Sequence, residues 1–148
     1  MSEIADVLGF LKSMGQVNLH STSVDVLPPG TSEADFTDTA WQDSSATETF
    51  EAAKSLLGFE MVNLSITASW RFNGKFISAF NVTVDGFVDK THEVEITATA
   101  PNRTPENADG VAELTYQILL VDNHILSGVN RVTFRGMVRG DGSGMNLA

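Results

Sequence analysis

Apolar side chains recur at helical spacing in two segments of the chain. The first segment is residues 2–14, where they lie between a serine suited to cap a helix and a glycine suited to end it. The second runs from Ser45 to Leu57, where Ser45 and Glu48 match a capping box and apolar residues follow at helical intervals. The pattern therefore predicts an N-terminal helix and one inserted short helix.

After residue 58 the hydrophobic period changes to two. Apolar and polar side chains alternate over 62–72 and again over 76–84, which predicts two strands with one dry face each. A one-residue slip in their pairing would place apolar side chains opposite polar ones. Burial therefore favours a three-residue loop with Gly74 in the left-handed conformation, which would pair Ile66 with Phe80.

Other segments show strand patterns, and they complete a β-rich chain. They are residues 16–27, 91–100, 111–121 and 125–138. Residues 31–44 have no clean period and form an irregular insert. We expect a mainly β fold, an antiparallel β barrel or sandwich of about six strands with the two helices added. Residues 1–140 then form a single domain, and 141–148 a flexible C-terminal tail.

Composition and charge exclude several classes of partner. The chain has 148 residues, enough for one hydrophobic core, and a net charge of −10. That charge repels nucleic acid and anionic membranes, so neither is expected as a partner. The chain contains no cysteine, which excludes disulfides and thiolate chemistry. Its N-terminus is acidic where a secretory signal would be basic, so we expect a cytoplasmic protein.

Aromatic side chains gather on one face of the strands around the hairpin. Trp70, Phe76 and Phe80 share this face, where they either fill the core or line a pocket for an apolar ligand. Trp41 lies in the irregular insert, and we expect it to anchor that segment against the sheet or over a cavity mouth.

Few residues offer catalytic chemistry. The sequence lacks the phosphate-binding loop, the dinucleotide-binding glycine motif, the nucleophile elbow and the zinc-protease motif. His92 shares a strand face with apolar residues, where it is either a candidate acid or base or an ordinary strand-end histidine. An enzyme built on this chain would draw on a small set of polar groups: His92, Tyr116, Asp43 and Arg135.

Clusters of charged residues are weaker candidates for a binding site than the aromatic face. Arg131, Arg135 and Arg139 project from one strand face, where they could bind a carboxylate or phosphate or pair with glutamates on neighbouring strands. Acidic residues of the insert do not follow the spacing of a calcium-binding loop. We therefore expect no metal and no cofactor.

Three functional hypotheses follow from these observations. The first is a non-enzymatic binding module that receives a small apolar or anionic molecule or a protein partner. Its expected ligand-binding residues combine the aromatic set with polar neighbours: Trp70, Phe76, Phe80, Trp41, His92, Tyr116 and Arg135. The second is a barrel-type cyclase, isomerase or hydrolase acting on an apolar substrate. The third is a self-assembling structural protein, for which a homodimer is the oligomer we expect first.

Overall fold

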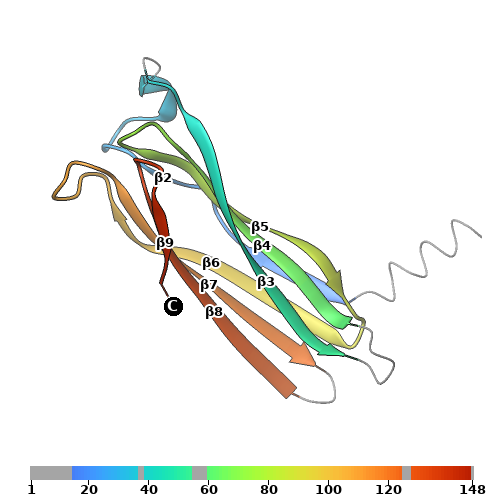
Figure 1. Cartoon of the computed structure of the whole chain (residues 1–148). Coiled ribbons are helices and arrows are strands. Elements are labelled where there is room, and N and C mark those ends of the chain that lie inside the picture. Colours follow the sequence, from blue (N-terminus) through green and yellow to red (C-terminus); the bar gives the residue numbers. More distant parts are fainter. Residues whose placement is uncertain (1–14, 37–38, 55–59, 125–127, 148) are drawn as a thin grey trace, which may run out of the picture.

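The protein is built from two β-sheets that lie face to face in a sandwich-like arrangement (Figure 1). The computed structural model describes residues 15–36, 39–54, 60–124 and 128–147. The first sheet has the order β1 (Gln16–His20), β6 (His92–Thr104), β7 (Glu113–His124), β8 (Gly128–Arg139), β9 (Gly144–Asn146). The second has the order β2 (Val24–Val26), β5 (Ile77–Val88), β4 (Glu60–Phe72), β3 (Gln42–Lys54). Among the described residues the strands do not close into a barrel.

Alternating side chains of both sheets form the core between them. On β4 the inward residues are at most 5% exposed: Val62, Leu64, Ile66, Ala68 and Trp70. Apolar residues of β6 and β7 meet them from the first sheet: Val94, Ile96, Leu114, Ile118 and Leu120. The strand patterns predicted for these segments are confirmed. The segment predicted as a strand at 111–121 corresponds to β7, the middle strand of its sheet.

The chain crosses from one sheet to the other between β1 and β2. β1 pairs in parallel with β6, and after His20 it leaves that strand and crosses to β5. Val24 then lies opposite Phe80 in the second sheet. The segment predicted as one strand over 16–27 is therefore two short strands in different sheets. All other strand pairs are antiparallel.

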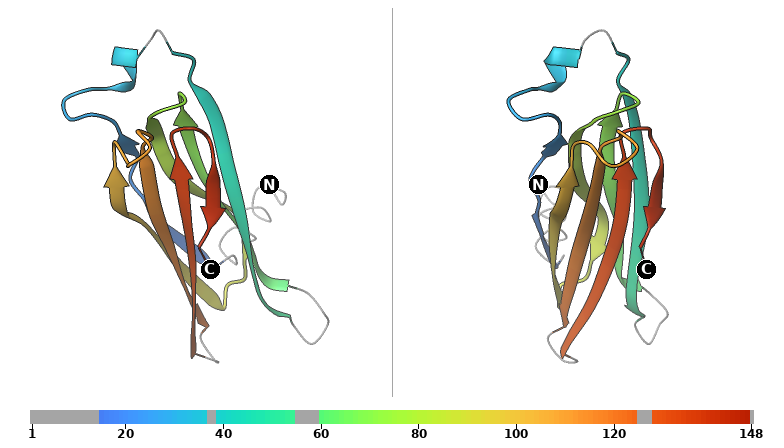
Figure 2. Two further views of the ribbon diagram at one scale, coloured as in Figure 1. Left: turned by 60° about the vertical axis from the view of Figure 1, so that its left-hand side comes forward. Right: turned by 90° about the vertical axis from the view of Figure 1, so that its left-hand side faces the viewer.

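The irregular insert carries a 3₁₀ turn, η1 (Glu33–Phe36), at one end of the two sheets (Figure 2). Glu33 forms an ion pair with Arg71 on β4 and accepts a hydrogen bond from the Ser78 hydroxyl at 2.5 Å. The ring centroids of Phe36 and Phe76 lie 4.9 Å apart. These contacts fix the insert against the second sheet.

The predicted inserted helix is wrong, because residues 42–54 form the edge strand β3. Ala46 pairs with Ala68, and Phe50, which is 5% exposed, pairs with Leu64. The serines and threonines of this segment favour extended backbone over a helix interior. Pairing with β4 also gives hydrogen-bond partners to the backbone N–H and C=O groups of this segment. This tertiary interaction outweighs the local capping-box pattern that favoured a helix.

The hairpin between β4 and β5 exists, but its predicted register is wrong. Ile66 lies opposite Val84 rather than Phe80. The side-chain carbonyl of Asn73 accepts the N–H groups of Lys75 and Phe76, which extends the loop beyond three residues. A bulge in the pairing between Ser69 and Arg71 then brings the apolar side chains of β4 and β5 opposite one another again. Gly74 has φ of +96°, as the left-handed prediction required.

The structure bears on the two ends of the chain to different extents. The helix predicted over residues 2–14 lies outside the described residues. The segment predicted as a tail contains β9, whose Met145 pairs with Met137 of β8. Within the part of the chain that the structure describes, no helix has the length and apolar character needed to cross a bilayer.

Candidate functional site

The aromatic face predicted from the sequence is packed as core. Trp70, Phe76 and Phe80 are 5%, 7% and 3% exposed. Phe80 stacks against Tyr116 of the opposite sheet, with ring centroids 5.1 Å apart. The hollows that could receive a ligand therefore lie at the open sides of the two-sheet structure, where the aromatic core reaches the surface.

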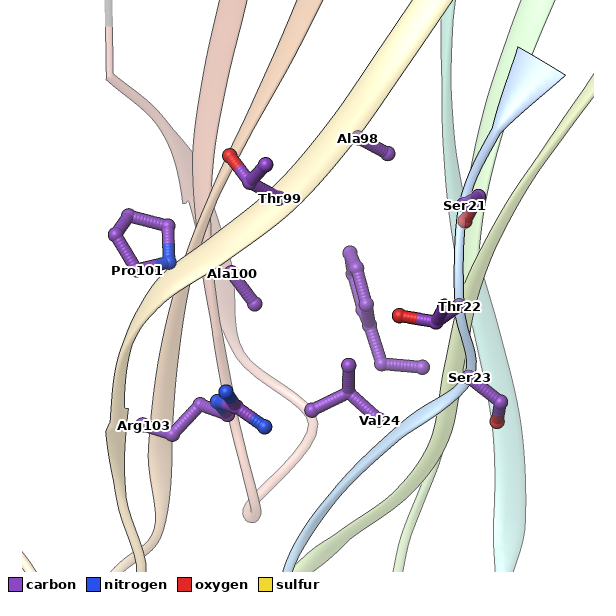
Figure 3. A pocket seen from close by; sticks show the side chains of 10 residues that line it. Ser21, Thr22, Ser23, Val24, Ala98, Thr99, Ala100, Pro101 and Arg103 are labelled. Atoms are coloured by element: carbon purple, nitrogen blue, oxygen red, sulfur yellow. The ribbon is translucent and has the colours of Figure 1, made fainter.

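The first hollow lies where the chain crosses between the sheets, and we call it the Arg103 groove. It measures about 330 Å³. Its walls are Ser21, Thr22, Ser23, Val24, Phe80, Ala98, Thr99, Ala100, Pro101 and Arg103. Figure 3 shows Ala98 and Ala100 of β6 and Thr22 and Val24 of the crossing segment directed into the space between them. The groove thus combines an apolar floor with a hydroxyl-bearing wall.

The groove exists because β1 ends before β6 does. The last pair between them joins His20 to Thr97, whereas β6 continues to Thr104. No described strand pairs with β6 on this side beyond Thr97, so the backbone groups of β6 that point away from β7 there have no strand partner. Pro101, which also lines the groove, has no N–H to donate. A bulge between Thr99 and Asn102 bends the strand here.

Arg103 closes one end of the groove. Its side chain extends from β6 toward Val24 in Figure 3. Among the described residues, the ion pairs of the protein involve other cations, so the Arg103 guanidinium has no carboxylate partner there. Arg103 is exposed to solvent at this end of the groove, where its guanidinium can pair with a planar anion such as a carboxylate.

The second hollow lies at the opposite open side, between β3 and the strands β8 and β9, and we call it the Glu48 cleft. It measures about 260 Å³. Its walls are Ser45, Ala46, Glu48, Trp70, Tyr116, Met137, Val138, Gly144, Met145 and Asn146. Two side chains predicted as ligand-binding, Trp70 and Tyr116, therefore meet here.

Tyr116 is held in the cleft by a glycine on the neighbouring strand. It pairs with Gly136, and a Cβ atom at that position would lie 2.3 Å from the Tyr116 hydroxyl oxygen. The ring can therefore lie flat against the backbone of β8. Burial raises the pKa of Tyr116 above its ordinary value of 10.0, and the nearby Glu48 carboxylate raises it further. Tyr116 is thus a neutral hydroxyl at physiological pH.

The chain matches no protein family, no curated protein and no solved structure with which it was compared. The function must therefore be argued from these hollows.

His92 forms a buried pair with Asp122. Its Nδ1 lies 2.7 Å from Asp122 Oδ1, and the two residues are 3% and 4% exposed. The ring of His124 stacks beside it at a centroid distance of 4.4 Å. The Nε2 atom of His92 is buried without a hydrogen-bond partner among the described residues, so no described hydroxyl is placed there as a nucleophile. This geometry is typical of a structural polar pair.

The remaining predicted residues lie away from both hollows. Arg135 is exposed, and its Nε donates to Gln117 Oε1 at 3.3 Å. Arg139 forms an ion pair with Asp109, so the row of three arginines does not act as one anion site. Trp41 is half-buried against the core, and Asp43 lies 3.3 Å from the Arg71 Nε. In the described segments, no cluster of three or more histidine or acidic residues could hold a metal ion.

Sequence reasoning missed the key residues of the Arg103 groove. Arg103 lay beyond the strand predicted at 91–100, whereas β6 continues to Thr104, and Ser21 to Ser23 lay in a segment interpreted as one strand. The run of small hydroxyl residues at 21–23 was an available signal for a break in that strand. The other wall of the groove is the edge of β6, which is far from residues 21–23 in sequence. No local pattern in the sequence indicates that this edge is unpaired.

Proposed function

We propose that the protein is a binding module that receives an extended, carboxylate-bearing peptide segment in the Arg103 groove. The observation that carries this proposal is the unpaired edge of β6 inside a hollow that ends at Arg103. Of the partners anticipated from the sequence, it favours a protein segment with an anionic group.

The backbone edge of β6 selects an extended ligand. Peptides bind exposed sheet edges by adding a strand, where main-chain hydrogen bonds supply affinity. β1 already shows this geometry on the adjoining part of β6, because it pairs there in parallel from Gln16 to His20. A ligand strand would continue that edge in the place that β1 vacates. About three extended residues span ~10 Å, which suits a hollow of about 330 Å³.

The side chains of the groove select the composition of the segment. Phe80, Val24 and the two alanines offer a floor for small apolar side chains. Arg103 offers a bidentate partner for a carboxylate, either an acidic side chain or a chain terminus. Because the protein as a whole carries a net charge of −10, a lone guanidinium in a hollow gives local specificity rather than general attraction to anions.

The lining of the groove favours binding over catalysis. Its only ionisable side chain is Arg103, which stays protonated and cannot serve as a general base. The hydroxyls of Ser21, Thr22, Ser23 and Thr99 have no lining histidine or carboxylate to activate them.

The proposal is tested by titrating ¹⁵N-labelled protein with acetyl-Ala-Val-Ala-Val as the free acid and as the C-terminal amide. We expect the acid to shift the amide signals of Ala98, Ala100 and Thr22 and to bind about tenfold more tightly than the amide. Arg103→Gln should remove that difference. Arg131→Gln, an exposed arginine on β8, is the matched control and should preserve it.

A second pair of peptides tests the strand addition itself. Methylating the backbone nitrogen of a residue whose N–H faces β6 should abolish binding, whereas methylating the next residue should not, because neighbouring N–H groups point to opposite sides. Equal affinity of acid and amide, equal effects of the two methylations, or shifts that map elsewhere would each contradict the proposal.

A further inference from the structure

Glu48 is an inward-pointing carboxylate on the edge strand of the second sheet. It pairs with Ile66, which is fully buried, so its side chain shares the inward face of the sheet. Inward charges on edge strands often prevent edge-to-edge pairing. Preventing edge-to-edge pairing does not require a cavity next to the charge. Glu48 nevertheless lines a hollow, together with Trp70, Tyr116 and two methionines.

Two polar groups of this hollow are incompletely paired. Trp70 is 5% exposed, and its Nε1 has no hydrogen-bond partner among the described residues. Glu48 Oε1 accepts one hydrogen bond, from Asn146 Nδ2 at 3.2 Å. In the described part of the chain no lysine, arginine or histidine forms an ion pair with Glu48. The buried indole N–H therefore has no partner among the described residues, and the half-buried carboxylate has one amide partner but no counter-charge there.

The chemistry of these groups specifies one kind of ligand. A carboxylate next to tryptophan and tyrosine attracts an organic cation, through charge and through the electron-rich aromatic rings. Met137 and Met145 supply a deformable apolar wall for the carbon chain of such a cation.

We infer that the Glu48 cleft binds a primary alkylammonium group, as carried by a free alkylamine or by a lysine side chain of a partner. This site lies on the opposite side of the two sheets from the Arg103 groove and shares no residue with it. The inference is therefore independent of the peptide-binding proposal.

The two tryptophans of the chain provide a direct readout. Their indole N–H signals separate in ¹H–¹⁵N spectra, and Trp41→Phe assigns the signal of Trp70. Titration with n-butylammonium chloride at about 0.15 M salt should shift the Trp70 signal with saturation. 1-Butanol, the neutral analogue, should bind about tenfold more weakly or less. Nα-acetyl-lysine N-methylamide, which keeps its side-chain ammonium group, distinguishes the two sources. Tighter binding of this compound than of butylammonium indicates a lysine side chain as the ligand, and weaker binding indicates a free alkylamine.

Matched variants separate the site from general attraction to an acidic protein. Glu48→Gln should weaken butylammonium binding about tenfold, while Glu51→Gln, an exposed carboxylate on the same strand, should leave it unchanged. Arg103→Gln should also leave it unchanged. Unaltered positions of the other amide signals show that each variant is folded. Equal losses in the two glutamate variants, equal binding of butanol, or no saturation would overturn the inference.

Discussion

The rings of Phe80 and Tyr116 meet across the core with their centroids 5.1 Å apart, and each ring lines a different hollow. Phe80 forms part of the floor of the Arg103 groove, and Tyr116 part of the wall of the Glu48 cleft. One aromatic pair thus joins the two sheets and separates the two candidate sites.

This contact predicts energetic coupling between the two residues. Phe80→Leu and Tyr116→Leu should each destabilise the protein, and the double variant should lose less than the sum of the two. The coupling expected for an aromatic pair is about 0.5–1.5 kcal/mol in the free energy of unfolding. Urea denaturation of the four proteins measures it, and additivity within about 0.3 kcal/mol would show that the pair contributes nothing beyond area.

The ionisation of Tyr116 can be followed cleanly because it is the only tyrosine in the chain. The phenol absorbance should titrate with a midpoint above the ordinary pKa of 10.0. Since the folded pKa is raised, the stability linked to the neutral phenol is present below pH 10.0 and is lost as pH rises through the folded pKa.

Glu48→Gln should lower that midpoint only in part, because burial is the larger cause of the raised pKa and remains in the variant. Glu51→Gln is the control. A midpoint at the ordinary value in the folded wild-type protein would show that Tyr116 is solvated and that the cleft is described wrongly.

Asp89 stabilises the turn between β5 and β6, which joins the two sheets. Its carboxylate accepts hydrogen bonds from the Thr91 backbone N–H at 2.9 Å and the Thr91 hydroxyl at 2.8 Å. These bonds lower the pKa of Asp89 below its ordinary value of 3.8. Because the folded pKa is depressed, its contribution is present above 3.8 and is lost as pH falls through the folded pKa.

Asp89→Ala should therefore cost about 1 kcal/mol at about pH 7 and much less at about pH 2. The free energy of unfolding at both pH values, for wild type and variant, measures the difference. An equal cost at both values would mean that the carboxylate charge does not stabilise the turn. Glu93→Ala, at an exposed carboxylate on β6, controls for the general effect of removing an acid from an acidic protein.

The buried pair of His92 and Asp122 should behave as a unit. Removing either partner leaves the other buried without its hydrogen bond, so His92→Leu and Asp122→Leu should each cost about 3–5 kcal/mol. The double variant removes both buried polar groups and should be clearly more stable than the sum of the single losses implies. Simple additivity in denaturation experiments would contradict the pairing.

The sequence predicts this fold best where pairing and periodicity agree. The alternation along β4 and β6 reflects burial on one face, and both strands have the dry face that was expected. The segment of β3 combines a capping-box pattern with many serines and threonines, and only its pairing with β4 decides between helix and strand. The register of the hairpin depends on the side chain of Asn73 in the loop, which periodicity does not describe.

The candidate sites were harder to predict, for a related reason. Trp70 and Tyr116 were identified from their residue types, and the structure brings them together in the Glu48 cleft. Arg103 was missed because its importance arises from where β1 leaves β6, which is a relationship between segments about eighty residues apart in sequence. Local patterns carry no information about such an unpaired edge.

The claim that β6 presents a free edge for a ligand strand is tested most directly by amide hydrogen exchange. In the free protein, the amides from Ala98 to Thr104 that point away from β7, Pro101 having none, should exchange much faster than the β1-facing amides from Glu93 to Thr97. Saturation with acetyl-Ala-Val-Ala-Val should slow these amides and leave the edge of β3 unchanged. If the same amides are already protected in the free protein, or stay fast in the saturated one, the groove is not a strand-binding site.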